Sequence, residues 1–440
     1  MIKRFANLRV LVIDDMSAMR AAIKVQLAEM EIVNVDQAAN ADDAIRMLDT
    51  RGEYDAIFCD YNLNKATSGQ QFLEFIKSQE LLPPNTIFIM VTAEAEYGSV
   101  VSAAEFQPDD YLLKPFTASK IKSRLERLID RRDALQPLMQ RLAKKDFAGA
   151  VAESDKLIQA NSKWIMEALR RKGEALLQTG RHEDAITTYQ VALAMRGDLG
   201  WAQFGLARGY FAAGRLDETR TIANDILERN VAYVLVYDLL AEIAEDQGDF
   251  ETALDLLRHA LAVVPSARRN RIVAEAAYRM GNLEVARTSF EQAIRKTRGS
   301  ITAQATDCLF LAQTHVDSGE PKQAFLVLEA GVGEFGDKGV FAQVQASIKA
   351  QAYIRQGDAA SAKKMLVRAG NLIPEPGGNL ATVFMARALL AAGEEEEGMK
   401  LLVDIAVRGA PGNRAILGLA RKIRRDVASL TRKAELSGAS

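Results

Sequence analysis

The sequence has few of the residues that hold small extracellular domains or metal clusters together. Its 440 residues include only two cysteines, Cys59 and Cys308, and three histidines. That number gives neither a disulfide framework nor a zinc-ligand spacing, which favours a reducing compartment. No run approaches about 18 uninterrupted apolar residues, so we expect no membrane span. The N-terminus has no apolar stretch after its basic residues, so we expect no signal peptide and a cytoplasmic location.

The charged residues are distributed unevenly along the chain. Residues 1–117 contain 10 Lys/Arg and 18 Asp/Glu, a net charge of −8, whereas the remainder has 46 and 40, a net charge of +6. An acidic first part suits a cation site and disfavours nucleic acid binding there. The length predicts roughly two to four domains, and the apolar share of 48% allows a folded core throughout.

The first 117 residues alternate between short apolar runs and amphipathic segments. Strands are predicted at 8–14, 32–37, 54–60, 86–91 and 110–113. Helices are predicted at 17–29, 40–50, 69–79, 95–104 and from 118 onwards. Ser17 and Asn40 are predicted to cap the first two helices. This alternation is typical of an α/β fold with a doubly wound, parallel, five-stranded sheet.

Polar side chains follow several of these strands: Asp14 and Asp15 on the first, Asp60 on the third, Thr92 on the fourth and Lys114 on the fifth. The carboxyl ends of parallel strands form the ligand-binding edge of such a sheet. Carboxylates suit Mg²⁺, and phosphoryl transfer needs mainly charge neutralisation and alignment. Asp60 is therefore a candidate nucleophile towards phosphorus, with Lys114 balancing charge and Thr92 donating a hydrogen bond. The alternative is that these are ordinary polar residues at strand ends.

This stretch resembles the receiver domain of two-component response regulators. The resemblance covers about the first 120 residues and includes the Asp14–Asp15 pair, Asp60, Thr92 and Lys114–Pro115. It implies that a sensor histidine kinase or phosphotransfer protein phosphorylates Asp60. It also implies that Mg²⁺ is bound by Asp15, Asp60 and the backbone carbonyl of Asn62, with Asp14 acting through water. No enzyme activity is expected beyond self-phosphotransfer and autodephosphorylation.

The resemblance also assigns a switch and shows small departures from the family pattern. Thr92 and Tyr111 occupy the positions of the switch residues, although Tyr111 is also readable as a plain half-buried tyrosine. Leu63–Asn64 replaces the usual Met-Pro, and Gly69 lies one residue late. Asn62 and Glu94 flank the site as in chemotaxis-type receivers, from which we expect a short-lived phosphorylated state.

Residues 119–145 form a predicted helical junction. Apolar residues with heptad-like spacing occur at Ile121, Leu125, Leu128, Leu135, Met139 and Leu142, with Arg132 at one core position. A dimeric coiled coil, and hence a homodimer, is one interpretation. Because Pro137 interrupts the pattern, the sequence favours one helix ending near Ala134 and a second starting with Pro137 in its first turn.

Regular glycines dominate the rest of the chain, at 180, 214, 248, 281, 319, 357 and 393. Small residues stand seven before and five after most of them, so each unit is predicted to be helix, glycine turn, helix. This pattern resembles the tetratricopeptide repeat, with aromatic positions at Tyr189, Tyr210, Phe290 and Tyr353 and terminal prolines at Pro265 and Pro374. We expect about seven to eight units over 146–411, opened by a degenerate unit at 147–161, and a capping helix and tail over 412–440.

Such arrays stack into a superhelix whose groove binds peptides or helices of other proteins. No catalytic arrangement is visible there, since His182, His259 and His315 show no metal-like pairing. The leading hypothesis is a phosphorylation-controlled adaptor that binds an unidentified protein and neither nucleic acid nor membrane. The alternatives are a phosphate sink or constitutive scaffold and, because 420–433 is basic, a DNA-binding regulator.

Overall fold

The computed structural model describes residues 5–63, 67–83, 85–93, 106–372, 379–408, 419–420 and 422–423. The chain divides into two units. The first contains Met1–Val264 together with Gly299–Thr302, and the second contains Pro265–Arg298 and Ala303–Ser440.

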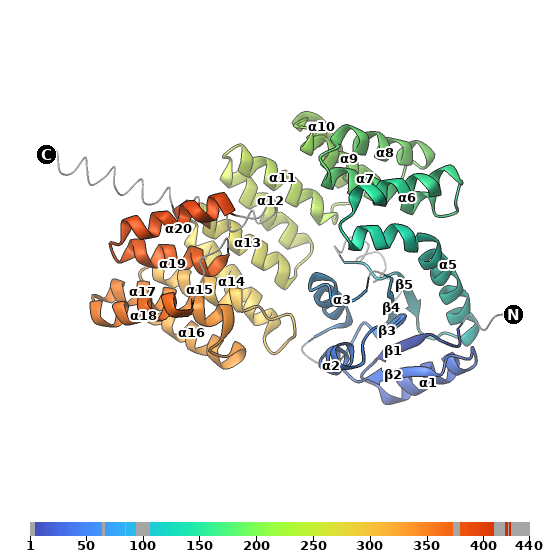
Figure 1. Ribbon diagram of the computed structural model, residues 1–440, viewed down its shortest axis with the longest axis horizontal. Coiled ribbons are helices and arrows are strands. Elements are labelled where there is room, and N and C mark those ends of the chain that lie inside the picture. The colour runs from blue at the N-terminus through green and yellow to red at the C-terminus, as the bar shows by residue number, and fades with distance from the viewer. Residues whose placement is uncertain are drawn as a thin grey trace. The chain divides into compact units, whose positions relative to one another are not determined.

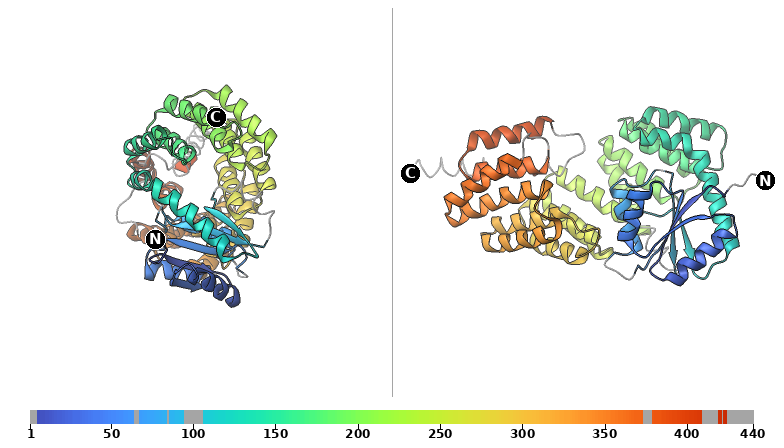
Figure 2. Two further views of the ribbon diagram at one scale, coloured as in Figure 1. Left: turned by 90° about the vertical axis from the view of Figure 1, so that its right-hand side faces the viewer. Right: turned by 60° about the horizontal axis from the view of Figure 1, so that its bottom comes forward.

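A parallel five-stranded sheet forms the start of the first unit (Figures 1 and 2). Its strands are β1 (Arg9–Ile13), β2 (Asn34–Ala38), β3 (Ala56–Asp60), β4 (Ile87–Thr92) and β5 (Asp110–Leu113). The helices around it are α1 (Ser17–Ala28), α2 (Ala41–Arg51), α3 (Gly69–Ser78) and α5 (Ala118–Ala143). The strand order β2-β1-β3-β4-β5 is that of a doubly wound fold and confirms the predicted class.

Each face of the sheet has its own hydrophobic core. On one face Val10 and Phe58 pack with Leu27 of α1 and Leu125 of α5. On the other face Leu11, Ile57 and Met90 pack with α2 and α3. β3 and β4 are buried on both faces, as expected for central parallel strands, so their carboxyl ends are held at a fixed edge.

The two predicted helix caps have different outcomes. The Asn40 side chain accepts a hydrogen bond from the Asp43 amide and caps α2, as predicted. The prediction for Ser17 is wrong, because Ser17 lies inside α1 and Met16 is the capping residue without a side-chain bond. The carboxylate of Asp14 accepts the Met16 amide instead, at 2.9 Å. The predicted helix 95–104 lies outside the described residues.

The predicted break in the junction is wrong. One helix, α5, runs through Ala134 and contains Pro137. A proline inside a helix removes one amide donor and clashes with the preceding turn, which bends a helix whose two halves are both packed. Figure 1 shows the resulting change of direction along α5.

Intrachain packing accounts for the heptad-like spacing. The apolar residues in the first half of α5 join the core between α1, α5 and the sheet. Those in the second half join the core of the first repeats. The residues concerned are Ile121, Leu125 and Leu128 in the first core, and Leu135, Met139 and Leu142 in the second. Arg132 pairs with Asp55 at 3.0 Å. The apolar seam is thus covered by the chain itself, which leaves no apolar stripe to support the coiled-coil interpretation.

Fifteen helices follow in the described residues after α5, and all but the first are paired around glycine turns, as predicted (Figure 1). They are α6 (Phe147–Gln159), α7 (Ile165–Gln178), α8 (His182–Met195), α9 (Gly200–Ala212), α10 (Leu216–Arg229), α11 (Val234–Asp246), α12 (Phe250–Val263), α13 (Ala267–Met280), α14 (Leu283–Thr297), α15 (Ala305–Asp317), α16 (Pro321–Phe335), α17 (Gly339–Gln356), α18 (Ala359–Leu372), α19 (Leu380–Ala391) and α20 (Glu395–Arg408). The seven predicted turn glycines all have positive φ, between 73° and 87°. Positive φ favours glycine, so the period follows from backbone geometry.

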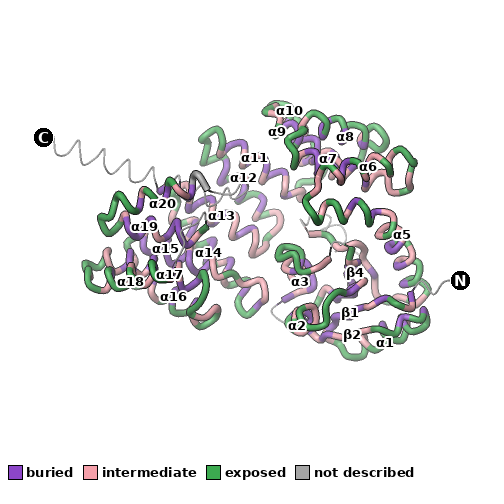
Figure 3. The backbone as a smooth tube through the Cα atoms, in the orientation of Figure 1, coloured by how far each residue is buried: buried purple, intermediate pink, exposed green. Residues whose placement is uncertain are grey.

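Small residues lie where paired helices approach most closely, as the repeat pattern predicts. A Cβ on Gly173 or Gly205 would lie 2.5 or 2.4 Å from the ring of Tyr189, which is 2% exposed. In Figure 3 the buried residues of the repeats follow the sides on which helices face each other. Pro374 and most of the predicted cap 412–433 lie outside the described residues.

Candidate functional site

Three carboxylates meet at the carboxyl edge of the sheet. Asp14 and Asp15 follow β1, and Asp60 ends the neighbouring strand β3. One oxygen from each lies within 4.8 Å of the others. Asp14 is 1% and Asp60 8% exposed. Such crowding of buried negative charge is costly unless a cation lies among the carboxylates.

Lys114 supplies one such cation. Its Nζ lies 3.1 Å from Asp14 Oδ2 and 3.0 Å from Asp60 Oδ1. Burial lowers the pKa of Lys114, but hydrogen bonds to both carboxylates outweigh burial and raise it, so the ammonium stays charged. Burial raises the pKa of Asp60, and Lys114 offsets only part of that rise. The site therefore holds one lysine against three acids and can accept further positive charge.

Backbone contacts fix these side chains in place. The Lys114 amide donates to the Thr92 carbonyl at 2.8 Å, and the Lys114–Pro115 peptide bond is cis. Arg20 donates to the carbonyl oxygens of Asp14 at 2.6 Å and of Asp15 at 3.1 Å. Arg20 was not predicted from the sequence, because a helix arginine that braces a loop through backbone carbonyls has no motif.

Gly69 is the second feature that sequence reasoning undervalued. A Cβ there would lie 2.0 Å from the carbonyl oxygen of Asp60 and 3.1 Å from Cys59 Sγ. The start of α3 therefore approaches the backbone of Asp60 too closely for any other residue. The sequence showed only that Gly69 lies one residue later than in the family pattern. Its close approach to the Asp60 carbonyl depends on how the loop folds.

Comparison with known proteins adds independent evidence. Residues 10–126 match the response regulator receiver domain family. Chemotaxis protein CheY-3 of Vibrio cholerae is 31% identical over 125 residues, covering 28% of this chain and 94% of CheY-3. CheY of Pseudomonas aeruginosa is 32% identical over 124 residues, covering 28% of this chain and 98% of that protein. The chain belongs to the response regulator receiver family.

The repeats match known families as well. Tetratricopeptide repeat families match residues 176–243, and also 141–199 and 239–301. A tetratricopeptide repeat protein from Parabacteroides merdae has a similar structure, with 14% identity, a TM-score of 0.39 and coverage of 66% of this chain and 98% of that one. By its family matches, this response regulator combines an N-terminal receiver domain with tetratricopeptide repeats, a module suited to protein interaction. In the described part of the chain, no helix is both long and apolar enough to span a bilayer.

The receiver's acidic cluster suits the Mg²⁺ that the family implies. The clustered donors are all carboxylate oxygens, the ligand type that Mg²⁺ prefers, and no histidine or cysteine competes among them. Asp14, Asp15 and Asp60 are thus able to hold the ion. Asn62, whose carbonyl the resemblance adds as a ligand, is exposed and lies two residues beyond β3.

The two expected switch residues lie on neighbouring strands of the receiver. Thr92 ends β4 and is 3% exposed, and β4 pairs with β5, which carries Tyr111. Burial raises the pKa of Tyr111, and its hydroxyl has no hydrogen-bond partner among the described residues. Glu94, expected beside the site, lies outside the described residues.

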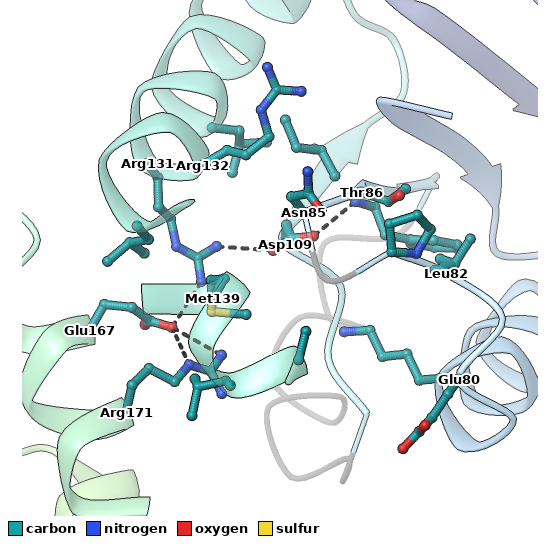
Figure 4. Close-up of a pocket in the computed structure, with 18 of the residues that line it drawn as sticks. Glu80, Leu82, Asn85, Thr86, Asp109, Arg131, Arg132, Met139, Glu167 and Arg171 are labelled. Atoms are coloured by element: carbon teal, nitrogen blue, oxygen red, sulfur yellow. Dashed lines mark hydrogen bonds and ion pairs between the residues drawn. The ribbon is translucent and has the colours of Figure 1, made fainter. Parts of the chain in front are cut away.

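A cavity of about 560 Å³ lies between the receiver, α5 and α7, at the start of β4 and β5 (Figure 4). Arg131 of α5 joins its two sides, because its guanidinium bonds Asp109 at 3.0 Å and Glu167 of α7 at 3.2 Å. Arg171 also bonds Glu167, at 3.1 Å. Figure 4 shows these side chains pointing towards one another. Asp109, directly before β5, is thereby linked to α7, the first helix of the first glycine-turn pair. The sequence did not predict this link.

Proposed function

We propose that this response regulator is phosphorylated on Asp60 and that the phosphoryl group changes how its repeats bind a partner protein. The observation that carries the proposal is the contact of Lys114 with both Asp14 and Asp60 beside the third carboxylate, Asp15. These groups form a site with excess negative charge, which suits a cation and, with it, a phosphoryl group. The two free, buried cysteines are consistent with a cytoplasmic protein.

Phosphoryl transfer uses few groups of the chain. A carboxylate oxygen of Asp60 attacks the phosphorus of a phosphohistidine on a sensor kinase or phosphotransfer protein. The new O–P bond forms as the donor's P–N bond breaks, and the electron pair leaves with the imidazole nitrogen. Lys114 moves its charge towards the phosphoryl oxygens, and the Thr92 hydroxyl donates to one of them. Asp15, Asp60 and the Asn62 carbonyl, with Asp14 through water, would hold Mg²⁺, which would supply further charge neutralisation.

The interaction energies are compatible with a switch. A phosphoryl group adds a charge of about −1.5 to −2. Hydrogen bonds to charged groups contribute about 1.5–3 kcal/mol each, so contacts from Thr92 and Lys114 supply roughly 3–6 kcal/mol. Converting a population ratio of 1:99 into 99:1 needs about 5.5 kcal/mol. Two contacts are thus enough to bias a two-state element.

The strand β5 is the proposed route from the site to the repeats. Lys114 follows its carboxyl end, Tyr111 lies within it, and Asp109 precedes it. A movement of Tyr111 towards Thr92 displaces β5 and with it the Asp109–Arg131–Glu167 contacts. We infer that the state of Asp60 thereby sets the position of α7 and the surface that the repeats present to a partner.

The first test is phosphoryl uptake. Purified protein with acetyl phosphate and Mg²⁺ is expected to gain the mass of one phosphoryl group and to lose it within minutes to hours. Asp60→Asn is expected to gain none, and chelation of Mg²⁺ is expected to prevent uptake. Asp49→Asn, which alters an exposed acid of α2, is the matched control and retains uptake. Equal uptake by Asp60→Asn disproves the assignment.

A partner screen then separates the adaptor from a phosphate sink. The phosphorylated protein and Asp60→Asn are used as bait in parallel. An adaptor shows at least one partner whose retention differs by about tenfold between the two baits. A sink takes up phosphoryl groups normally while retaining the same partners in both states.

A further inference from the structure

First helices of several repeats meet at a polar junction in the second unit. Tyr278 of α13 donates its hydroxyl hydrogen to Asp317 of α15 at 2.8 Å. Arg387 of α19 donates to Asp317 at 2.6 Å and also to the Tyr278 hydroxyl oxygen. These three residues span 109 positions of sequence, so α13, α15 and α19 surround a common space.

An apolar pocket of about 270 Å³ lies beside this junction. Its lining includes Tyr278, Thr306, Phe310 and Leu380, together with the charged residues Glu275 and Arg279. The ring of Phe310 packs against Tyr278 with centroids 5.6 Å apart, and also against Phe384 at 5.6 Å. Because several first helices supply these side chains, the pocket belongs to the inner layer of the repeats, where binding grooves form.

A late segment of the same chain occupies part of this pocket. Leu419 lines it and is 3% exposed, while Ala420 and Ile423 are each 4% exposed. Leu419 and Ile423 are both helical and are four residues apart, the spacing of neighbours on one helix face. Lys422 places its ammonium 5.8 Å from the centre of the Tyr278 ring, within range of a cation–π contact.

This position differs from that of a simple end cap. A cap covers the outer face of the last repeat only, here α19 and α20. Leu419 instead shares a pocket with Tyr278 of α13 and Phe310 of α15, which belong to earlier repeats.

We propose that this pocket is the docking site for an amphipathic helix of a partner protein, and that the late segment carrying Leu419 and Lys422 occupies it as an internal competitor. The seated segment defines the partner's chemistry: two branched apolar residues four apart, with a lysine or arginine directly before the second. The inference rests on the repeats being the binding module proposed above, and it does not depend on phosphorylation of Asp60. A partner must displace the internal segment, which weakens binding in the resting state.

The test uses the full chain, no phosphodonor, and a fluorescein-labelled synthetic peptide with the sequence of residues 413–430. The double variant Leu419→Asp/Ile423→Asp frees the pocket. A tethered competitor acts at an effective concentration of about millimolar, so the variant is expected to bind the peptide at least about tenfold more tightly than wild type. Equal affinity of the two proteins, or no binding to either, overturns the proposal.

Three further variants complete the test: one locates the binding, one avoids the added charges, and one controls for an added charge elsewhere. Adding Thr306→Trp to the double variant fills the pocket from α15 and is expected to abolish binding; unchanged binding overturns the assignment of the pocket. Leu419→Ala/Ile423→Ala, which preserves solubility if the aspartates disturb folding, is expected to give an intermediate gain. Val403→Asp, at a side chain of α20 that is 47% exposed, is expected to bind like wild type. If the peptide-binding test fails while the protein still takes up a phosphoryl group, the pocket proposal is overturned and the proposed phosphorylation of Asp60 stands.

Discussion

At the residue scale, the site is explained by where strands end. Asp60, Thr92 and the acid pair were predictable because apolar β-branched runs end at them, and parallel strands bring such ends together. The capping of α1 and the role of Gly69 were not predictable in the same way. Each depends on a contact of the folded backbone, the Met16 amide in one case and the Asp60 carbonyl in the other.

Gly69→Ala tests whether α3 controls the position of the phosphoacceptor. The added methyl group cannot fit 2.0 Å from the Asp60 carbonyl oxygen, so the Asp60 backbone must shift. We expect a loss of about 1–3 kcal/mol in the free energy of unfolding and at least tenfold slower phosphoryl uptake. Urea denaturation and intact-mass kinetics measure the two effects.

Gly333→Ala is the matched control for this substitution. Gly333 lies inside α16, and a Cβ there has nothing within 4 Å. Because alanine is the better helix former, we expect a gain of about 0.5–1 kcal/mol and unchanged uptake. A Gly69→Ala variant that behaves like this control contradicts the proposed close approach.

At the scale of elements, α5 shows that local sequence spacing alone does not determine where a helix packs. The heptad-like spacing and Pro137 together suggested a coiled coil or a break, whereas the two halves of one bent helix pack on two different cores. Local sequence cannot show which core a helix face will meet. The period of the glycine turns was readable because positive φ is a backbone property that glycine alone satisfies cheaply.

Glu167→Gln tests the electrostatic link between α5 and α7. Burial raises the pKa of Glu167, but Arg171 and Arg131 outweigh burial and lower it. A lowered pKa means that this carboxylate stabilises the fold fully above its unfolded pKa of about 4.3 and loses that contribution as pH falls through the folded value. We expect Glu167→Gln to cost about 1.5–3 kcal/mol at pH 7.

The pH dependence distinguishes this link from simple packing. The difference between wild type and Glu167→Gln in urea denaturation is expected to shrink between pH 5 and pH 3, because protonation removes the charge in wild type too. Glu228→Gln, on an exposed residue of α10, is expected to show a negligible difference at every pH. A Glu167→Gln difference that stays constant from pH 7 to pH 3 contradicts the ionic link.

At the scale of the whole molecule, the receiver and the repeats were both recognisable from sequence, for different reasons. The receiver has fixed polar residues at strand ends, and the repeats have a period. What joins them was not recognisable, because Asp109, Arg131 and Glu167 are ordinary charged residues until the fold brings them together. The occupied pocket of α13, α15 and α19 is likewise a product of long-range packing.

The most direct test of the account is hydrogen exchange on the full chain, with and without acetyl phosphate and Mg²⁺, after uptake has been confirmed by mass. We predict altered exchange in α5 and α7 of wild type, no alteration in Asp60→Asn, and an effect confined to the receiver in Arg131→Ala. Wild-type protein that carries the phosphoryl group yet exchanges identically in α5 and α7 would contradict the claim that Asp60 controls the repeats.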